Sequence, residues 1–412
     1  MHPRNISQKI QAALSDTPVV LLNGARQTGK STLTQWLMEK GYPATYFNLD
    51  NVSTLATALN DPTHFTENLQ GPTILDEIQR TPNLFLAIKE AVDKNRRAGQ
   101  FLLTGSANVL LLPTLSDSLA GRMEIINLWP LSQGEIQGTK EFFIDALFSE
   151  KLTLPTHSRL TREELIQKII FGGYPEVLTR QSEDRRYAWF DSYITTILQR
   201  DVRDIANIDG LMQLPRLLTL LATRASHLFN LAEISRISGI AQTTLSRYFA
   251  VLQTIFLIYT IPAYSNNLGK RLTKSSKLYF CDTGLSTHLL GITFSRLQHE
   301  PDLLGPLLEN FVANELKKQL SWNKTHAELF HYRTTNGQEV DFILENKAGF
   351  AIGIEVKSSA TLSEKDFKGL KHLSETLDDK LIRGILLYTG QQTLSFGKNL
   401  YAIPIGLLWE KN

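Results

Sequence analysis

The chain has 412 residues, of which 43 are basic and 41 acidic, so its formal net charge is only +2. This length predicts roughly two to four domains, because a domain usually contains about 100–200 residues. Hydrophobic residues make up 42% of the chain and charged residues 20%, a globular composition that excludes a disordered or collagen-like protein. The single cysteine, Cys281, excludes an intramolecular disulfide, and the sequence shows neither a signal peptide nor an apolar run long enough to span a membrane. We therefore expect a cytoplasmic protein with no membrane partner.

Short apolar runs alternate with helical stretches through the first part of the chain. The runs lie at residues 18–22, 45–49, 72–76, 100–104 and 123–128. Alternation of this kind predicts an α/β domain in which helices cover a parallel sheet. We assign this domain to residues 1–132 and a mainly helical lid to residues 133–205.

A phosphate-binding loop follows the first predicted strand. The segment GARQTGKS matches G-x-x-x-x-G-K-[ST] in full and precedes a helix predicted at residues 31–40, a context that disfavours a simple glycine turn. In such a loop the backbone N–H groups wrap a phosphate, Lys30 reaches the β- and γ-phosphates, and Ser31 ligates Mg²⁺. The residues predicted to bind ATP here are Gly24, Ala25, Arg26, Gln27, Thr28, Gly29, Lys30, Ser31 and Thr32.

Two acidic residues end the predicted strand at residues 72–76. Asp76 is expected to hold Mg²⁺ through water, and Glu77 to polarise the water that attacks ATP. Because ligands in parallel sheets bind at the carboxyl ends of the strands, both residues are expected beside the phosphate-binding loop. The alternative is an acidic loop start.

Two later segments contain further candidates. Ser106 and Asn108 follow the strand at 100–104, where they either sense the γ-phosphate or simply end the strand. Arg122 follows a predicted helix. It either completes the transition state of a neighbouring subunit as an arginine finger, which would require a ring or smaller homo-oligomer, or caps the helix.

Several motifs occur in a fixed order along the chain. They are GARQTGKST, ILDEIQR, LLTGSAN, LAGR with PLSQGE, FGGYPE, LYFCDTGL, and GQEVDFIL with IEVKSS. Together they resemble the AAA+-type ATPases that carry a C-terminal DUF4143 domain, the AAA_14 plus DUF4143 architecture. The resemblance covers nearly the whole chain and implies that Lys30, Ser31, Asp76 and Glu77 bind and hydrolyse Mg-ATP.

The near-neutral total hides a basic segment. Residues 211–280 contain eight Lys and Arg residues and one acid, Glu233, so their local charge is +7 and that of the rest of the chain is −5. A localised basic surface of this kind favours a nucleic-acid partner.

The same segment has the pattern of a winged helix-turn-helix, which we assign to residues 206–290. Leu231, Ile234 and Ile237 are expected to face inward on a helix that ends at Gly239, and a second helix begins near Ala241. Two strands around a basic loop are expected to form the wing. The alternative is a packing or oligomerisation module. The residues predicted to contact DNA are Gln242, Thr243, Ser246 and Arg247 in the second helix and Lys270, Arg271 and Lys274 in the wing.

The last segment, residues 291–412, carries acids at the spacing of a PD-(D/E)xK nuclease core. Asp341 lies in a strand predicted at residues 339–344, and Glu355 and Lys357 share one face of the next strand because side chains alternate along a strand. Asp341 and Glu355 would bind Mg²⁺, Glu309 on the preceding helix would support it, and Lys357 would orient the water or stabilise charge. Val340 stands where the motif usually has proline. The alternative is a salt-bridge cluster on a solvated face.

These observations predict an α/β protein with a P-loop ATPase core, a helical lid, a winged helix-turn-helix and a restriction-endonuclease-like C-terminal domain. Our first hypothesis is an ATPase that couples hydrolysis to DNA binding and metal-dependent cleavage. The alternatives are an ATP-dependent switch or adaptor with an inactive nuclease-like scaffold, and a DNA translocase or helicase.

Overall fold

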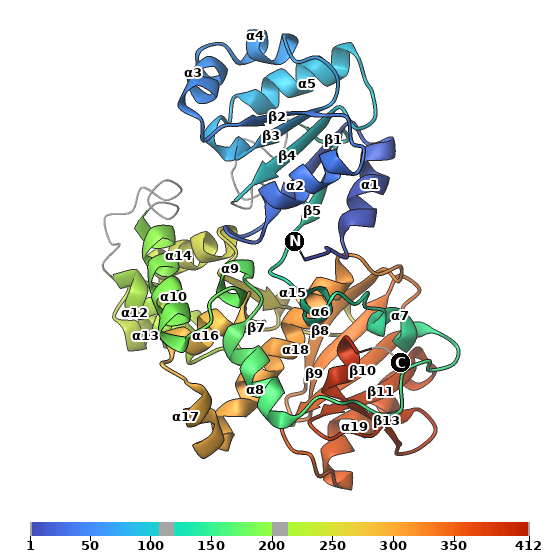
Figure 1. Ribbon diagram of the computed structural model, residues 1–412. Helices are drawn as coiled ribbons and strands as arrows, with labels where there is room; N and C mark the ends of the chain where they lie inside the picture. The colour runs from blue at the N-terminus through green and yellow to red at the C-terminus, as the bar shows by residue number, and fades with distance from the viewer. Residues whose placement is uncertain (1, 107–118, 200–212, 411–412) are drawn as a thin grey trace.

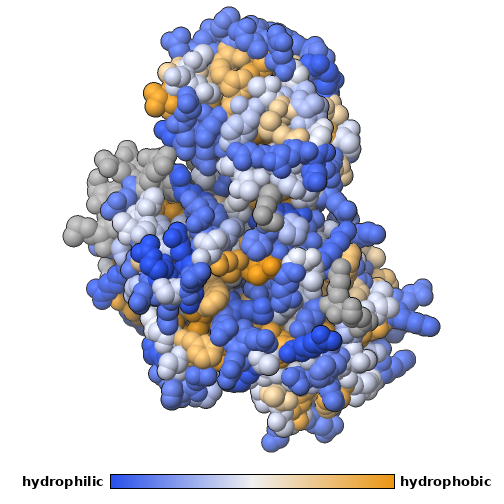
Figure 2. Space-filling view, viewed as in Figure 1, coloured by the Kyte–Doolittle hydropathy of each residue, from blue (hydrophilic) through white to orange (hydrophobic). Residues whose placement is uncertain are grey.

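The computed structural model describes residues 2–106, 119–199 and 213–410, without the side chains of Leu268, Lys270 and Thr273. An α/β lobe formed by the N-terminal part of the chain stands above a larger body, with the N-terminus between them (Figure 1). In the larger body, a helical part lies beside the C-terminal sheet (Figure 1). Hydrophilic residues cover most of the face seen in Figure 2, and hydrophobic residues are exposed there in small groups. Within the described ranges, none of the helices is both long and apolar enough to cross a membrane.

The N-terminal lobe contains a five-stranded sheet in the order β2-β3-β4-β1-β5, and all its strands run parallel. The strands are β1 (Val19–Asn23), β2 (Thr45–Asn48), β3 (Thr73–Asp76), β4 (Phe101–Gly105) and β5 (Met123–Asn127). Each lies at a predicted apolar run, so the predicted parallel α/β domain is confirmed.

Helices cover both faces of this sheet, and the side chains of β1 are therefore buried on both sides. Val20 and Leu22 pack with one group of helices, and Val19 and Leu21 with the other. The first group is α1 (Ser7–Asp16) and α2 (Lys30–Glu39), and the second is α3 (Val52–Asn60), α4 (Pro62–Glu67) and α5 (Leu84–Lys94).

The next described part of the chain, residues 133–199, is mainly helical. The described helices are α6 (Gln133–Gln137), α7 (Phe143–Phe148), α8 (Arg162–Phe171), α9 (Pro175–Leu178) and α10 (Glu183–Ile197). Between α7 and α8 the chain bridges to the C-terminal sheet at His157 and Gln392, and both helices pack against α18 (Leu304–Leu320). This segment therefore packs against the C-terminal part of the chain.

A helical unit and a hairpin follow. The elements are α12 (Leu214–Ala222), α13 (Leu231–Ser238), α14 (Gln242–Thr254), β6 (Ile258–Ile261), α15 (Leu268–Thr273), β7 (Lys277–Phe280), α16 (Thr283–Leu289) and α17 (Phe294–His299). Strands β6 and β7 are antiparallel, and Leu228 adds an isolated bridge to Lys277. The expected inward face of α13 is wrong at Ile237, which is 45% exposed.

The C-terminal part is a separate mixed sheet in the order β12-β13-β11-β10-β9-β8. The two strands predicted around Asp341 and Glu355 are β9 (Glu339–Asn346) and β10 (Ala351–Lys357). The other strands of the sheet are β8 (Ala327–Arg333), β11 (Leu381–Tyr388), β12 (Leu394–Ser395) and β13 (Leu400–Pro404). Strands β10 and β11 send alternate side chains to the two faces of the sheet. Helix α18 packs in the hydrophobic core on one face, and α19 (Lys368–Leu377) packs in the core on the other.

The β6–β7 hairpin docks on the edge of this C-terminal sheet. Ala263 forms a parallel bridge with His331 on β8, supported by hydrogen bonds from the Tyr264 N–H to the His331 oxygen at 2.6 Å and from the His331 N–H to the Pro262 oxygen at 3.0 Å. One hydrophobic core contains residues of the helical unit, the hairpin and the C-terminal sheet. The predicted wing therefore packs against its neighbour instead of projecting freely.

Candidate functional sites

The phosphate-binding loop lies between β1 and α2, at the carboxyl edge of the sheet. Gly24 has no room for a side chain, because a Cβ there would lie 2.2 Å from the Leu128 carbonyl oxygen, and Gly29 has a left-handed φ of +91°. The Lys30 ammonium donates hydrogen bonds to the carbonyl oxygens of Gly24 and Ala25 at 2.9 and 2.8 Å. Lys30 is 95% buried (5% exposed), so its charge is held inside the loop. The remaining loop residues predicted to bind ATP are Arg26, Gln27, Thr28, Ser31 and Thr32, which continue into the first turn of α2.

Strand β4 lies between the loop and the two acids. It pairs with β1 on one side and β3 on the other, so the ends of all three strands meet at one edge. The Asp76 carboxylate is buried there and accepts hydrogen bonds from the hydroxyls of Tyr46 and Thr104. The next residue, Glu77, has a left-handed φ of +63°, a costly conformation for a residue with a side chain. The structure thus brings both predicted acids to the edge that carries the loop.

Gln79, which no sequence motif marks as functional, joins Glu77 to Ser106. Its side-chain amide donates to the Glu77 carboxylate and, at 2.8 Å, to the Ser106 hydroxyl, while its oxygen accepts from the Ser106 N–H at 3.4 Å. Ser106 therefore lies near Glu77, and its role as a γ-phosphate sensor stays a prediction. Asn108 lies outside the described residues.

Arg122 lies at the amino-terminal ends of the strands, whereas the phosphate-binding loop lies at their carboxyl ends. Arg122 directly precedes β5, and its carbonyl oxygen accepts from the N–H of Val19 at the start of β1. Its guanidinium pairs with Asp93 on α5 at 2.5 and 3.0 Å and also donates to the Ala120 carbonyl at 3.0 Å. A finger role toward the loop of its own subunit is therefore excluded by position.

Two residues remote from the motif hold the loop from outside. Arg4, which is 8% exposed, donates to the carbonyl oxygens of Thr28 at 2.8 Å and Trp129 at 2.6 Å, and lies 3.2 Å from Glu135. The Tyr193 hydroxyl on α10 donates to the Arg26 oxygen at 3.3 Å. No local sequence pattern marks either residue, because both act across the fold.

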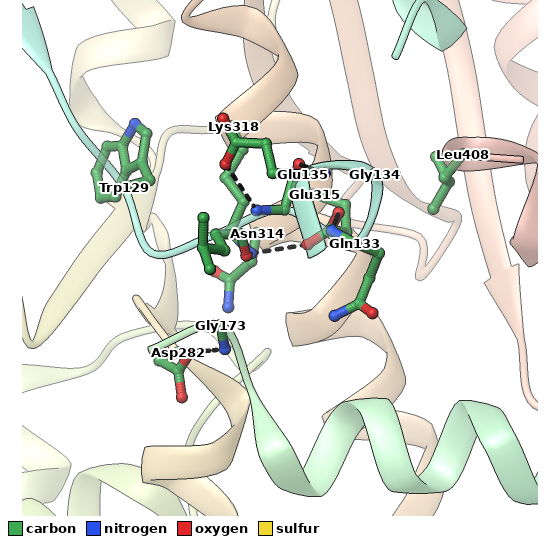
Figure 3. Close-up of polar contacts among 12 residues, drawn as sticks. Trp129, Gln133, Gly134, Glu135, Gly173, Asp282, Asn314, Glu315, Lys318 and Leu408 are labelled. Carbon is green, nitrogen blue, oxygen red and sulfur yellow. Dashed lines mark hydrogen bonds and ion pairs between the residues drawn. The ribbon is translucent and has the colours of Figure 1, made fainter. Parts of the chain in front are cut away.

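Residues of several sequence motifs meet in a buried junction (Figure 3). The Gln133 N–H donates to Glu315 on α18 at 2.9 Å, and Lys318 pairs with the other Glu315 oxygen at 2.7 Å. Nearby, the Gly173 N–H donates to Asp282 at 2.7 Å, and a Cβ at Gly173 would lie 2.3 Å from the Leu131 oxygen. The motifs PLSQGE, FGGYPE and LYFCDTGL therefore join the parts of the molecule.

A second cluster of charged side chains lies on the C-terminal sheet. Strands β9 and β10 are antiparallel, and their register places Asp341 beside Glu355, as predicted for adjacent strands. The Val356 N–H donates to Asp341 at 2.9 Å, and the Lys357 ammonium donates to Glu355 at 2.7 Å. Glu309 comes from α18 and faces the same cluster. All four predicted residues are thus brought together.

Lys277 is an unpredicted member of this cluster. As the first residue of β7 it belongs to the segment counted as basic surface, yet its side chain is only 3% exposed. Its ammonium lies 2.8 Å from Glu339, 3.0 Å from Glu309 and 3.5 Å from Asp341. The cluster borders a cavity of about 430 Å³.

Burial and like charge change the acidity of this cluster. Burial and the neighbouring Asp341 raise the pKa of Glu309 to about 8 and that of Glu355 also to about 8. Burial by itself lowers the pKa of Lys277, but Glu309, Asp341 and Glu339 together raise it above its usual value. The carboxyl groups of Glu309 and Glu355 therefore keep their protons to a higher pH than an exposed glutamate does.

The side chains of this cluster are of the types that bind a divalent metal ion. Carboxylate oxygens suit Mg²⁺ or Mn²⁺, and the Oε2 atom of Glu355 is buried without a hydrogen-bond partner. However, among the described residues no three His, Cys, Asp or Glu side chains converge as a ready metal site. The residue types fit a divalent cation, but Lys277 lies among them.

The predicted DNA contacts divide into two groups. Gln242, Thr243, Ser246 and Arg247 are exposed on α14, as is Lys274 after α15. Arg271, in contrast, pairs with Glu345 at 2.7 and 3.0 Å and stacks over Tyr264. Its predicted place on a phosphate is therefore wrong for this conformation, because an internal carboxylate already holds the guanidinium. The side chain of Lys270 lies outside the described part.

Three segments match known domain families. Residues 16–137 match the AAA domain family AAA_14, residues 162–296 a domain of unknown function (DUF8612), and residues 304–408 a domain of unknown function (DUF4143). Uncharacterised proteins of Mycobacterium tuberculosis and Mycobacterium bovis are each 32% identical over 401 residues, covering 97% of this chain and 83% of theirs. The chain belongs to the same family, the AAA_14–DUF4143 proteins.

More distant relatives are also known for this AAA_14–DUF4143 protein. An uncharacterised protein of Methanocaldococcus jannaschii is 23% identical over 427 residues, covering 98% of this chain and 90% of the relative. A solved Walker-type ATPase of Pyrococcus abyssi is similar with a TM-score of 0.43 and 15% identity, over 70% of this chain and 96% of that one. The family match establishes an AAA-type P-loop ATPase domain in the N-terminal lobe, which implies nucleotide binding.

Proposed function

We propose that this protein hydrolyses Mg-ATP at the loop after β1 and uses the nucleotide state to control DNA binding. The observation that carries the first part is the meeting of the loop, Asp76 and Glu77 at one sheet edge. The backbone N–H groups of Gly24 to Thr32 would wrap the phosphates, and Lys30 would exchange the Gly24 and Ala25 carbonyls for phosphate oxygens.

Mg²⁺ fits this edge through Ser31 and Asp76. The Ser31 hydroxyl oxygen would be a direct ligand of the ion. Both Asp76 oxygens already accept hydrogen bonds, so Asp76 would act on the ion through water. When bound, the ion neutralises charge on the phosphates. Glu77 would polarise the attacking water, and Gln79 would hold Glu77 and Ser106 in place.

The test is ATP hydrolysis by the full chain, with and without single- and double-stranded DNA. We expect Lys30→Ala to lower the rate by about a hundredfold or more, because it removes charge stabilisation from the transition state. Lys40→Ala, which changes an exposed lysine at the end of α2, is the matched control. Hydrolysis that survives Lys30→Ala would reject the site, and a rate indifferent to DNA would reject the coupling.

DNA binding is supported by the arrangement after α12. The Leu228 bridge, helices α13 and α14, and the β6–β7 hairpin follow one another in the order of a winged helix. Four polar residues predicted to contact DNA are exposed early in α14, where a recognition helix meets base edges. We assign the contact surface to α14 and Lys274, since the docked hairpin commits Arg271 elsewhere.

Metal-dependent DNA cleavage is the second proposed activity. It is supported by Asp341 opposite Glu355, with Lys357 on the same strand as Glu355. Nicking of plasmid DNA with Mg²⁺ is the assay, and both Asp341→Ala and Lys357→Ala should abolish it. Equal nicking by all three proteins would reject the site.

The competing proposal is an ATP-dependent switch or adaptor with an inactive C-terminal scaffold. Lys277 favours it, because an ammonium among the acids neutralises charge that a metal would otherwise attract. Absence of nicking by a wild-type protein that hydrolyses ATP and binds DNA would favour the scaffold. We further propose two alternatives that rest on the ATPase domain. One is a DNA translocase, and the other is a homo-oligomer in which Arg122 acts on a neighbouring subunit.

A further inference from the structure

We propose that Lys277 is an internal counter-cation of the C-terminal site: its ammonium takes the place of a divalent cation between Glu309, Glu339 and Asp341 and must leave before the metal binds. This inference rests on the proposed metal-dependent site. It goes further by assigning a role to a residue from the β6–β7 hairpin, outside the segment that carries the acids.

The position of the ammonium supports this role. Carboxylates from α18 and β9 surround the Lys277 nitrogen at 2.8, 3.0 and 3.5 Å. Oxygen atoms of several carboxylates around one cation are the environment that Mg²⁺ and Mn²⁺ also require. An ammonium and a divalent ion repel each other and need the same oxygens, so the two cations compete.

The site retains a need for further positive charge. The Oε1 atom of Glu355 accepts from Lys357 at 2.7 Å, but its Oε2 atom is buried without a partner. An unpaired buried carboxylate oxygen is costly. Lys277 does not hydrogen-bond to Glu355 in the structure, whereas a metal ion bound at Asp341 would lie beside it, because the two acids are opposite each other. This oxygen is the second observation that points to a cation.

Exchange requires movement of one side chain. The backbone of Lys277 is held by pairing with Ile261 and by the bridge to Leu228. Its flexible four-carbon stem can rotate into the adjoining cavity of about 430 Å³, which is also lined by His227 and Ser358. The hairpin can therefore stay docked while the metal displaces the ammonium.

The test is calorimetric titration of the full chain with MnCl₂. Lys277→Met should bind Mn²⁺ at least about tenfold more tightly than the wild type, because affinity follows the net ligand charge. Lys347→Met, which removes an exposed lysine in the β9–β10 turn, should bind like the wild type. The gain should disappear when Asp341→Asn is added to Lys277→Met.

Two further readouts do not depend on cleavage. Mn²⁺ should raise the melting temperature of Lys277→Met more than that of the wild type, since the metal replaces the lost charge. If the variant does not fold, reductive methylation of the wild type replaces it, and Mn²⁺ should increase labelling of Lys277. Unchanged labelling would overturn the proposal.

The outcomes separate this inference from the function on which it rests. Equal Mn²⁺ affinity of the wild type and Lys277→Met, lost with Asp341→Asn, would overturn the role of Lys277 and leave the metal site standing. No Mn²⁺ binding by a folded Lys277→Met would overturn both. ATP hydrolysis, measured on the same samples, reports the nucleotide site separately.

Discussion

Gln79 lies between the polar groups that end β3 and β4. Its amide contacts both Glu77 and Ser106, so one side chain positions the proposed base and the proposed sensor together. Sequence patterns do not reveal such a residue, because a glutamine in a short 3₁₀ helix (Ile78–Arg80) has no motif of its own. Its contacts make it a positioning residue for hydrolysis.

We expect Gln79→Ala to lower kcat for ATP by about tenfold or more, because Glu77 loses the hydrogen bond that orients it. The KM for ATP should change little, since the hydrogen bonds of Gln79 go to Glu77 and Ser106 and not to the loop. Steady-state ATPase kinetics check this, with Asn83→Ala, an exposed neighbour, as the control. A rise in KM at constant kcat would contradict the assignment.

At the scale of elements, the β6–β7 hairpin has a different role from the one its charge suggested. Its loop contains α15, and the hairpin packs on β8 through the Ala263–His331 bridge. Arg271 strengthens this contact by pairing with Glu345 where both side chains are largely buried, at 12% and 18% exposure. Lys274, which follows α15, is instead exposed.

Arg271→Ala and Lys274→Ala should therefore have different effects. Arg271→Ala should lower the free energy of unfolding by about 1–3 kcal/mol, because Glu345 is left without its charged donor. Lys274→Ala should leave stability unchanged, weaken DNA binding and reduce the salt slope of binding by about 1. Urea unfolding and gel shifts at several salt concentrations check both. Loss of DNA affinity in Arg271→Ala without loss of stability would contradict the docking role.

At the scale of the whole molecule, a buried polar junction connects the lobes. Arg4 reaches from the loop residue Thr28 to Glu135, and Gln133 reaches Glu315 on α18. Helix α18 also carries Glu309, so the same helix contacts the junction and the C-terminal cluster. Contacts of α6 and α18 thus connect the nucleotide loop with the acidic cluster.

This junction contains a carboxyl group with a raised pKa. Burial, together with Glu315 and Glu135, raises the pKa of Glu141 to about 8, although Ser132 and Gly134 donate hydrogen bonds to it. Arg4 pairs with Glu135 and Lys318 pairs with Glu315, so these cations are already committed to the other acids. A group with a raised pKa stabilises the fold below its usual pKa and loses this effect as the pH rises through the folded value.

The protein should accordingly lose stability as the pH rises from about 4.5, the usual pKa of a glutamate, to about 8, and Glu141→Gln should lessen this loss. Thermal or urea unfolding across this range provides the measurement. Glu163→Gln, at an exposed acid on α8, is the control and should follow the wild type. A Glu141→Gln profile that is parallel to the wild type would show that Glu141 does not titrate there.

The structural features that depend on local patterns of residues could be predicted from the sequence. Alternating apolar runs predicted the parallel sheet, the glycines and Lys30 predicted the phosphate loop, and the two-residue repeat of a strand placed Glu355 and Lys357 on one face. The register of neighbouring strands then brought Asp341 to Glu355, as the spacing indicated.

Which charged side chains pair with each other depends on the tertiary fold. Arg271 finds Glu345 74 positions away in the sequence, Lys277 lies 64 positions from Asp341, and Arg122 pairs with Asp93 29 positions earlier. A count of local charge cannot show such pairs, because the energy of a buried ion depends on the partners that folding brings within a few ångströms. The basic segment read from the sequence is therefore partly neutralised inside the molecule, and one of its lysines belongs to the acidic site.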